Sequence, residues 1–485
     1  MYPTRQETSL VSNLDELEAA LSRELDIYAY PDRVWPVRQT SEGGEHVFDV
    51  VIVGGGQAAI GTAVGLIRER IANILLLDES SAGEEGPWVT YARMITLRTT
   101  KNMPGPDADL LNATFRAWYE AQFGAQAWAQ LNLIPKEQWM AYLKWLRRVM
   151  SIPVENNARV RRLSPHHVGF RVEIEGGNDI RQVLARKVVL ATGLGGAGGP
   201  RVPAFVASAL PKVRWAHSSE TIDFETLRGR RVAILGGNAS AFDNSAAALE
   251  GGAAEVLHFI RRKQHPEVNT LRYLEFAGLF RNFIRLDDEW RLRFTRRTLE
   301  QAIPPPPYSI ERCNAHPNFR LMMGCGWTSV REVDDGVEIA TIMGETYMVD
   351  FLILGTGFEV DLTRLDFLSE LQPHIQLWRD RVQLGLDALD QEIGRHPYLG
   401  EGLQCISRSP DHAATLSNLH FANGGSLASV GPIFTGINGM PFLIRRLVEA
   451  ISRDLFLSDV GAYWDAFTQF DRSDFEGKRE LLASA

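Results

Sequence analysis

The sequence predicts an α/β protein in which two Rossmann-like dinucleotide-binding domains share one chain, the second inserted into the first. An apolar strand runs directly into a glycine turn and a helix near residue 54, and the same pattern returns near residue 236. Another buried strand, ending in small residues, precedes the second unit, and a similar one follows it. The chain has 485 residues, too many for one ordinary core, so two or more domains are expected.

Composition and charge exclude several classes of function. Hydrophobic residues make up 45% of the chain and charged residues 23%, an ordinary globular mixture. The net charge of −9 argues against a general nucleic-acid-binding surface. No stretch approaches the ~20 consecutive apolar residues of a spanning helix, and residues 1–12 lack the apolar core of a signal peptide. We therefore expect a cytoplasmic protein with neither nucleic acid nor membrane as a partner.

The cysteines argue against thiol or zinc chemistry. The chain has three of them, Cys313, Cys325 and Cys405, and no pair has C-x-x-C spacing. This pattern excludes a dithiol redox centre and a zinc knuckle, and no metal site is predicted. Sparse cysteine use also fits a reducing cytoplasm.

Residues 1–44 are predicted to be a helical appendage. Leucines recur at helical spacing from Leu14 to Leu25, and Pro31 and Pro36 end the pattern. We expect this helix to pack on the surface of the first dinucleotide domain, whose first part spans residues 45–200.

The first glycine turn has the G-x-G-x-x-A pattern, in V-V-I-V-G-G-G-Q-A-A at residues 50–59. Gly54 permits the tight turn, Gly56 lets the backbone approach a pyrophosphate, and Ala59 allows close helix–strand packing. The helix N-terminus presents free N–H groups to the phosphates. Asp78 ends the next strand, 22 residues after Gly56, where a carboxylate can accept hydrogen bonds from ribose hydroxyls. The residues predicted to bind this cofactor are Gly54, Gly56, Gln57, Ala59, Asp78 and Glu79.

The second turn, V-A-I-L-G-G-N-A-S-A at residues 232–241, replaces the middle glycine with Asn238. Asparagine tolerates the left-handed backbone region, so the turn can survive, although its side chain crowds the phosphate approach. The following strand ends in Arg261 and Arg262, where the first unit has an acid. Arginine there would bind a 2′-phosphate and so favours NADPH over NADH, the alternative being a basic surface turn. The predicted binding residues are Gly236, Asn238, Ala239, Ser240, Arg261 and Arg262.

Two strands flank the second unit and end in related sequences. Residues 187–193 read K-V-V-L-A-T-G, and residues 351–358 read F-L-I-L-G-T-G-F. Small residues at these ends would let the chain cross between domains close to a cofactor. The residues predicted to lie there are Thr192, Gly193, Gly355, Thr356 and Gly357. The second domain is accordingly placed at 201–350, and the returning part of the first domain at 351–485.

The segment 262–330 is predicted to be an irregular insertion in the second domain. It carries an arginine-rich run at 291–297 and four consecutive prolines at 304–307. A lid over the second nucleotide site and a solvated surface segment are equally compatible with this composition. Further on, the Gly- and Pro-rich stretch 420–446 leads into a predicted apolar helix at 442–455.

The order of these motifs resembles the two-dinucleotide-domain flavoproteins and is most similar to the class B flavoprotein monooxygenases. These include flavin-containing, Baeyer–Villiger and N-hydroxylating monooxygenases, and the resemblance covers about residues 46–450. Trp88, in Gly86-Pro87-Trp88, stands where the family has a tryptophan touching the flavin. His217 and Ser218 match the His-Ser pair of the family fingerprint, but its Phe and Gly positions hold Pro211 and Val213. The W-P ending of the Baeyer–Villiger version is absent.

The resemblance implies FAD in the first site and NADPH in the second, with a small molecule and O2 as further partners. NADPH would pass a hydride to flavin N5, and the reduced flavin would form a C4a-(hydro)peroxyflavin that oxygenates the substrate. Oxygenation of an amine nitrogen is favoured because the Baeyer–Villiger ending is missing. Baeyer–Villiger or sulfur oxygenation, an NADPH-dependent flavin reductase or dehydrogenase, and a non-catalytic flavin-binding homologue stay open, as does a homo-oligomer.

Three residues are candidates for the reaction itself. Arg98, in L-R-T-T-K at 97–101, stands where many family members carry an active-site asparagine. Arg98 and Lys101 could neutralise a carboxylate substrate or contact cofactor phosphates. Asn438, in G-I-N-G-M-P, could lie near the isoalloxazine at a helix start. The alternative for each is a solvated or capping role.

Overall fold

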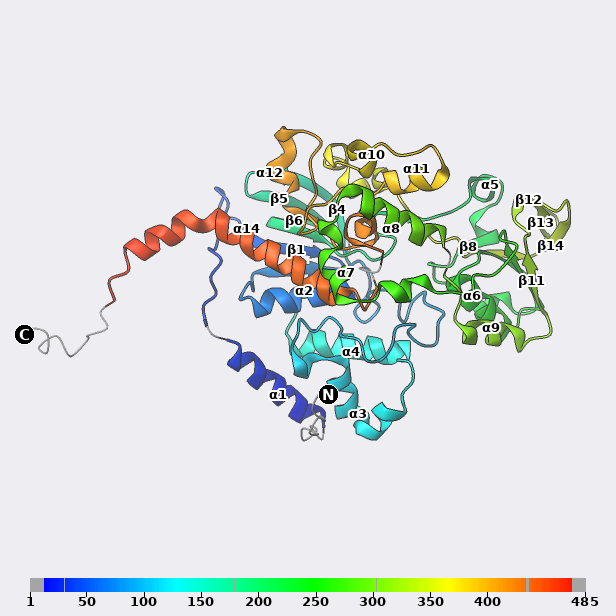
Figure 1. Ribbon diagram of the computed structural model, residues 1–485, viewed down its shortest axis with the longest axis horizontal. Coiled ribbons are helices and arrows are strands. Elements are labelled where there is room, and N and C mark those ends of the chain that lie inside the picture. Colours follow the sequence, from blue (N-terminus) through cyan, green and yellow to red (C-terminus); the bar gives the residue numbers. More distant parts are fainter. Residues whose placement is uncertain (1–12, 30, 178, 302, 433–435, 473–485) are drawn as a thin grey trace, which may run out of the picture.

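Two sheets with parallel strands organise the chain, one in each half of the molecule (Figure 1). The structure is a computed structural model that describes residues 13–472 apart from 30, 178, 302 and 433–435. The α/β class predicted from the sequence is confirmed, with two nucleotide-binding folds in one chain.

The larger sheet has seven strands in the order β3-β2-β1-β6-β5-β4, with β17 also paired to β6. Strands β3, β2, β1, β6 and β17 run parallel, whereas β6, β5 and β4 form an antiparallel meander. The strands are β1 (Val47–Val53), β2 (Ile74–Leu77), β3 (Val154–Glu155), β4 (Ala158–His166), β5 (Gly169–Gly176), β6 (Asp179–Leu190) and β17 (Leu419–Phe421).

The smaller sheet is entirely parallel, with the strand order β11-β10-β9-β15-β8. Its strands are β8 (Trp215–His217), β9 (Arg231–Leu235), β10 (Glu255–Ile260), β11 (Phe319–Met323) and β15 (Phe351–Leu354). In the division of the chain expected from the sequence, β15 belongs to the returning part of the first domain. In the structure β15 pairs with β9, so the second sheet extends to Leu354 rather than ending at 350.

Helices cover both sheets and leave the carboxyl ends of their strands facing the region between them. The larger sheet carries α2 (Gln57–Arg68), α3 (Phe115–Gln130), α4 (Lys136–Val149) and α14 (Met440–Thr468), with α1 (Leu14–Ile27) outside. The smaller sheet carries α5 (Ala204–Ala207), α6 (Ala239–Glu250) and α9 (Pro307–Asn314), and a three-stranded meander of β12 (Trp327–Val333), β13 (Gly336–Thr341) and β14 (Thr346–Val349). Among the described residues, no helix has the length and apolar character needed to cross a bilayer.

The insertion 262–330 is largely helical, whereas the sequence suggested irregular chain. It contains α7 (Ala277–Asn282) and α8 (Asp288–Glu300), followed by α9. The arginine run explains its position. Arg291 is buried, lies 4.9 Å from the ring centroid of Trp378 and donates to Tyr398 Oη at 2.7 Å. Arg296 pairs with Asp387 at 2.8 Å. The run therefore docks α8 against α10 (Trp378–Arg381) and α11 (Ala388–Gly394).

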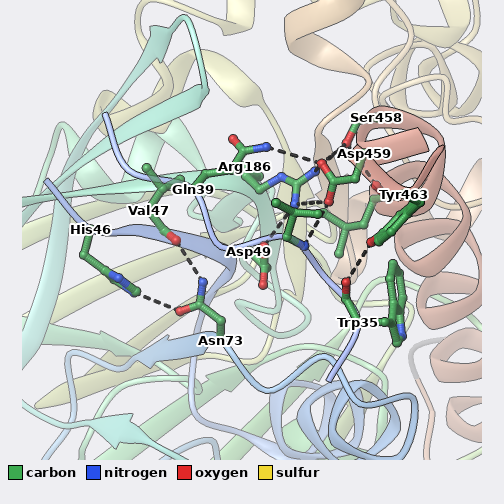
Figure 2. A network of polar contacts seen from close by, with 12 residues as sticks. Trp35, Gln39, His46, Val47, Asp49, Asn73, Arg186, Ser458, Asp459 and Tyr463 are labelled. Carbon is green, nitrogen blue, oxygen red and sulfur yellow. Dashed lines mark hydrogen bonds and ion pairs between the residues drawn. The ribbon is translucent and has the colours of Figure 1, made fainter. Parts of the chain in front are cut away.

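Helix α14 is anchored to the larger sheet by a buried polar network (Figure 2). The Arg186 guanidinium on β6 lies 3.1 Å from Asp49 on β1 and 2.7 Å from Asp459 on α14. About four helical turns before Asp459, α14 packs against α2, and the two helices run in the same direction. A Cβ on Gly61 would lie 2.2 Å from Ile444, and one on Gly65 would lie 2.8 Å from Val448. Because Gly61 and Gly65 have no side chains, the two helices can lie in direct contact.

The remaining connections are short. Strands β7 (Gly198–Pro200) and β16 (Phe358–Val360) pair antiparallel where the chain crosses from one sheet to the other and back. Short helices α12 (Ala413–Leu416) and α13 (Leu427–Val430) flank β17. This crossing ribbon lies beside the A-T-G and G-T-G-F sequences, because Arg201 donates its N–H to Gly357 O at 2.9 Å.

Candidate active site between the two sheets

The β1–α2 turn has the geometry of a diphosphate cradle. Gly54 has φ +114°, and a Cβ there would lie 2.5 Å from Ala191 O, so only glycine fits. Gly56 is the N-cap of α2, and no side chain caps the first-turn N–H groups. A Cβ on Gly56 would meet nothing within 4 Å. Free helix N–H groups facing open space are what a pyrophosphate requires.

Asp78 closes this turn from the end of β2. Its Oδ2 accepts from Gly55 N–H at 2.6 Å and its Oδ1 from Ser80 N–H at 2.8 Å. Each carboxylate oxygen keeps a second lone pair, so the predicted contact with ribose remains available. Glu79 is exposed and lies 3.5 Å from Arg159, with its side chain turned to the surface. The structure therefore brings Asp78, but not Glu79, into the turn.

The carboxyl ends of β6 and β17 complete the first site. Asn423, which follows β17, donates to Thr192 Oγ1 at 3.0 Å, and Gly424 N–H donates to Gly193 O at 3.0 Å. A Cβ on Gly193 would meet nothing within 4 Å. Asn423 is not among the residues predicted from the sequence, although the short segment L-H-F-A at 419–422 and the glycines at 424 and 425 resemble the other strand ends.

A second helix starts beside the first. Because α2 and α14 run parallel with Gly61 against Ile444, their N-termini lie at the same end of the pair. Asn438, two residues before α14, hydrogen-bonds to Glu275 of the insertion, while burial raises the pKa of that carboxyl. Asn438 is therefore near a helix start, as predicted, and in contact with the insertion.

Aromatic side chains wall the first site. Trp88 is buried, and its Nε1 has no hydrogen-bond partner among the residues that the structure describes. Its ring meets Trp139 edge-on at 6.4 Å, and Trp139 Nε1 donates to Gln57 Oε1 at 3.1 Å. A buried N–H without a partner is costly, so Trp88 has a donor to offer to a bound acceptor.

The β9–α6 turn repeats the first one. Gly236 has φ +156°, and a Cβ there would lie 2.3 Å from Gly355 O and 3.0 Å from Ala241 Cβ. Asn238, the N-cap of α6, has extended backbone with φ −106° and is exposed. The turn thus tolerates Asn238 because this position is extended, rather than because asparagine accepts the left-handed region. Ala239 and Ser240 form the first turn of α6, whose N–H groups have no side-chain cap.

Cations gather at the end of β10. Within the described part of the chain, the side chains of Arg261, Arg262 and Lys263 have no hydrogen bond or ion pair. Partial burial, with the neighbouring Arg261 charge, lowers the pKa of Arg262. Uncompensated positive charge at this position would attract a phosphate.

Two buried histidines line the second sheet. His217 ends β8, and its Nδ1 lies 2.7 Å from Ser219 Oγ while its Nε2 has no partner among the described residues. Burial lowers the pKa of His217, so the ring is held neutral. His258 Nε2 lies 2.8 Å from Gly236 O and its Nδ1 2.9 Å from Ser245 Oγ. His258 therefore supports the glycine turn from inside the sheet.

An ion pair joins the two halves across the gap between their sheets. Arg98 Nη2 lies 2.7 Å from Asp243 Oδ2 on α6, and Ser309 Oγ donates to the other oxygen of Asp243 at 2.6 Å. The Asp243 side chain is buried, whereas the Arg98 side chain is 41% exposed. Lys101 does not join this cluster, because its ammonium lies over the Trp128 ring and donates to Ala129 O at 3.3 Å. The structure gives Lys101 the capping role.

Comparisons with known proteins agree with this geometry. A family model described as pyridine nucleotide-disulphide oxidoreductase matches residues 51–274. The FAD-dependent urate hydroxylase of Xanthomonas campestris pv. campestris is 39% identical over 468 residues, covering 96% of this chain and 98% of the relative. The ornithine N-hydroxylase of Kutzneria sp. 744, solved with reduced FAD, NADP⁺ and L-ornithine, has a TM-score of 0.66 at 17% identity, covering 84% of this chain and 99% of that one. The ornithine hydroxylase of Pseudomonas aeruginosa has a TM-score of 0.65 at 16% identity, covering 84% and 100%.

Two nucleotide cradles at facing sheet ends define an oxidoreductase with separate flavin and nicotinamide domains. The likeness to the solved N-hydroxylases, at 16–17% identity, establishes this fold. The chain is 39% identical to the urate hydroxylase across 96% of its own length, and it belongs to the class B flavoprotein monooxygenases. FAD and NADPH are the cofactors of such an enzyme. The cysteines, all free and buried, offer no dithiol for disulfide chemistry.

Proposed function

We propose that this enzyme hydroxylates urate, using NADPH and O2 and forming water with the second oxygen atom. The carrying observation is the 39% identity to a urate hydroxylase across 96% of this chain and 98% of the relative. The solved N-hydroxylases share the fold at 16–17% identity, which leaves their substrates as a weaker guide. A purine is therefore the first substrate class to test.

The side chains at the gap support a planar, anionic substrate. The Arg98 guanidinium is partly exposed, and Asp243 holds it through Nη2. Its other N–H groups are available to bind an anion. The Asn438 amide and the Glu275 carboxylate provide a donor and an acceptor close to the start of α14. Such planar groups complement the alternating N–H and C=O edges of a purine in the way amide and guanidinium groups read nucleobases.

FAD would lie along the β1–α2 turn, with its flavin end toward Trp88 and the start of α14. NADPH would lie along the β9–α6 turn, with its 2′-phosphate against Arg261 and Arg262. When bound, the two cofactors supply hydride transfer to the flavin and activation of O2. The protein orients them, and the packed Trp88–Trp139 wall keeps water from the reacting ring. His217, neutral and buried, can hydrogen-bond a cofactor amide at the crossing of the domains.

Oxygenation of an amine nitrogen stays the second candidate. It is favoured by the missing Baeyer–Villiger ending and by the structural likeness to ornithine N-hydroxylases. Sulfur or Baeyer–Villiger oxygenation and a reductase without oxygen insertion are the remaining alternatives. The predicted cytoplasmic location also stays a prediction, supported by the sparse cysteines.

The test is oxygen uptake by the purified holoenzyme with NADPH, comparing urate, xanthine, L-ornithine, L-lysine and cadaverine. We expect urate alone to couple NADPH oxidation to oxygen consumption in a 1:1 ratio, with one ¹⁸O atom from ¹⁸O2 in the product. Coupled turnover of an amine instead would transfer the assignment to N-oxygenation. If every oxygen molecule appears as hydrogen peroxide with all five compounds, the monooxygenase assignment fails for them.

A further inference from the structure

The C-terminal half of α14 extends away from the rest of the chain (Figure 1). One face of this half is anchored. Asp459 lies 2.7 Å from Arg186, and Tyr463 Oη donates to Trp35 O at 2.8 Å (Figure 2). After Tyr463 the helix continues to Thr468 with every residue exposed. The anchored face fixes the direction of the helix and leaves its adjacent face to solvent.

That adjacent face is apolar. At 100° per residue, five large side chains of the helix fall in one strip beside the anchored face. Their exposed fractions run from 49% to 72%, and a sixth large apolar side chain, 70% exposed, follows the helix end. This surface, called the α14 stripe below, consists of Phe456, Leu457, Val460, Trp464, Phe467 and Phe470. Contiguous exposed apolar surface of this kind marks an interaction site.

We propose that the α14 stripe is the interface at which a second copy of this chain binds, antiparallel and about a twofold axis. Four of the six stripe residues are placed symmetrically about residue 462. Leu457 and Phe467 each lie five residues from this centre, and Val460 and Trp464 each lie two. In an antiparallel pair Leu457 therefore faces Phe467, and Val460 faces Trp464, each contact occurring twice. A twofold interface requires this self-complementary pattern.

A pocket at the base of the stripe fits the same register. It has a volume of about 420 Å³ and is lined by Trp35, Glu69, Glu449, Ser452, Arg453 and Phe456. Thr468, the last residue of α14, comes opposite Phe456 of the other copy, in the lining of this pocket, and Phe470 follows two residues later. Asp471, one residue further on, carries a charge opposite to that of Arg453 in the pocket lining. Each copy thus offers one aromatic side chain and one pocket.

The area and charge of the α14 stripe favour a second copy of this chain over a lipid bilayer as its partner. Six such side chains supply on the order of 600 Å² per copy, near the ~800 Å² per partner of a standard specific interface. Between positions 453 and 472 the chain carries four aspartates and two arginines, an excess of negative charge. Helices that lie on anionic membranes carry lysine and arginine beside the apolar face, so this charge pattern opposes membrane binding.

The oligomeric state of the holoenzyme tests the proposal. Sedimentation velocity at about 10 µM should give a dimer for the full chain. Trp464→Asp should raise the dimer dissociation constant at least about 100-fold, because it places a charge at the centre of an apolar contact. Leu386→Asp, at a 94% exposed side chain outside the stripe, is the matched control and should leave the dimer intact. A monomeric wild type, or equal behaviour of the two variants, would overturn the proposal.

Cross-linking tests the register. After mild oxidation, a mixture of Leu457→Cys chains and Phe467→Cys chains should give a disulfide-linked dimer, since these positions face each other. Either chain alone should give none, because the two like positions lie ~15 Å apart along the pair. Cross-linking of each chain with itself would indicate a parallel pair and overturn the antiparallel register. Flotation of a monomeric chain with vesicles of anionic phospholipid would assign the stripe to a membrane instead.

Discussion

An ion pair between Arg98 and Asp243 joins the flavin half of the molecule directly to the nicotinamide half. Its atoms lie 2.7 Å apart, and Ser309 fixes the second oxygen of Asp243 at 2.6 Å. Tyr308 Oη, from the same helix as Ser309, donates to Thr96 O at 3.3 Å. The loop that carries Thr96 and Arg98 therefore contacts both α6 and α9. Its contact with α6 lies about one turn from the start of that helix, where the NADPH phosphates would bind.

This bond should control the rate of hydride transfer. Asp243→Asn keeps the side-chain volume and the contact with Ser309 but removes the charge that attracts Arg98. Because a misplacement of about 1 Å can slow an oriented reaction up to ~100-fold, we expect flavin reduction by NADPH to slow about tenfold with unchanged FAD content. Anaerobic stopped-flow absorbance at saturating NADPH measures this rate.

The control for Asp243→Asn is a variant that breaks a different ion pair, on α3. Arg116 and Glu120 lie 2.8 Å apart on α3, far along the chain from both nucleotide turns. Arg116→Gln should leave flavin reduction unchanged, since this pair contacts neither nucleotide turn. If the Asp243→Asn variant reduces its flavin at the wild-type rate, contacts other than this ion pair position the flavin half and the nicotinamide half.

The unpaired Arg262 should determine coenzyme preference. Arg262→Ala removes a cation predicted to bind the 2′-phosphate, which NADH lacks. A charge-assisted hydrogen bond contributes ~1.5–3 kcal/mol, so we expect KM for NADPH to rise about 10- to 100-fold while KM for NADH changes little. Steady-state oxidation of both coenzymes checks this. An equal rise for both would remove the 2′-phosphate role from Arg262.

Local signals predicted the two nucleotide folds well. The strand expected just before Asp78 and the helix expected after the turn near residue 236 are present as β2 and α6. A glycine turn between a strand and a helix is encoded within about ten residues, so sequence suffices to find it. The same holds for the strand ends at Thr192 and Gly355, which are fixed by runs of apolar residues.

Long-range contacts could not be predicted. Asp243 lies within α6, and only the fold reveals that Arg98, 145 positions away, is its partner. The apolar pattern of 442–455 predicted the buried part of α14. Beyond Asp459 the helix has no buried residue, so no pattern of buried positions in the sequence indicates that it continues to Thr468. The helical insertion was missed because its arginines pack against Trp378 and Tyr398 from a distant segment, which hides their structural role in the sequence.

The two glycine turns should separate the two cofactors. Gly54→Ala would force a Cβ to 2.5 Å from Ala191 O, and Gly236→Ala would force one to 2.3 Å from Gly355 O, both at positive φ. We expect Gly54→Ala to purify largely without FAD. Gly236→Ala should keep FAD but bind NADPH at least about 100-fold more weakly. Flavin absorbance and coenzyme titration measure the two effects.

The matched control for the glycine variants is Gly461→Ala on α14, where a Cβ would meet nothing within 4 Å. It should keep both cofactors, and replacing a helical glycine by alanine should stabilise the helix by up to ~1 kcal/mol. Loss of FAD from Gly236→Ala, or retention of full NADPH affinity in it, would contradict separate sites.

Buried His258 should make the nicotinamide domain sensitive to acid. Burial lowers the pKa of His258 to about 4, against an ordinary value of ~6.5, while its hydrogen bond to Gly236 O opposes the shift. Between these values the unfolded chain takes up a proton that the folded chain does not, so the free energy of unfolding falls as pH falls. From pH 7 to pH 5 this loss is about 2 kcal/mol from His258 alone.

His258→Asn tests this dependence, because asparagine can keep one hydrogen bond and does not titrate. Urea unfolding at pH 7 should find the variant less stable than wild type, since Ser245 or Gly236 loses its partner. At pH 5 the difference should narrow by about 2 kcal/mol, because only the wild type pays for histidine protonation in the unfolded state. His420, whose pKa burial lowers to about 3, is retained in both proteins and cancels from the comparison. An unchanged difference at the two pH values would mean that His258 keeps its ordinary pKa in the folded protein.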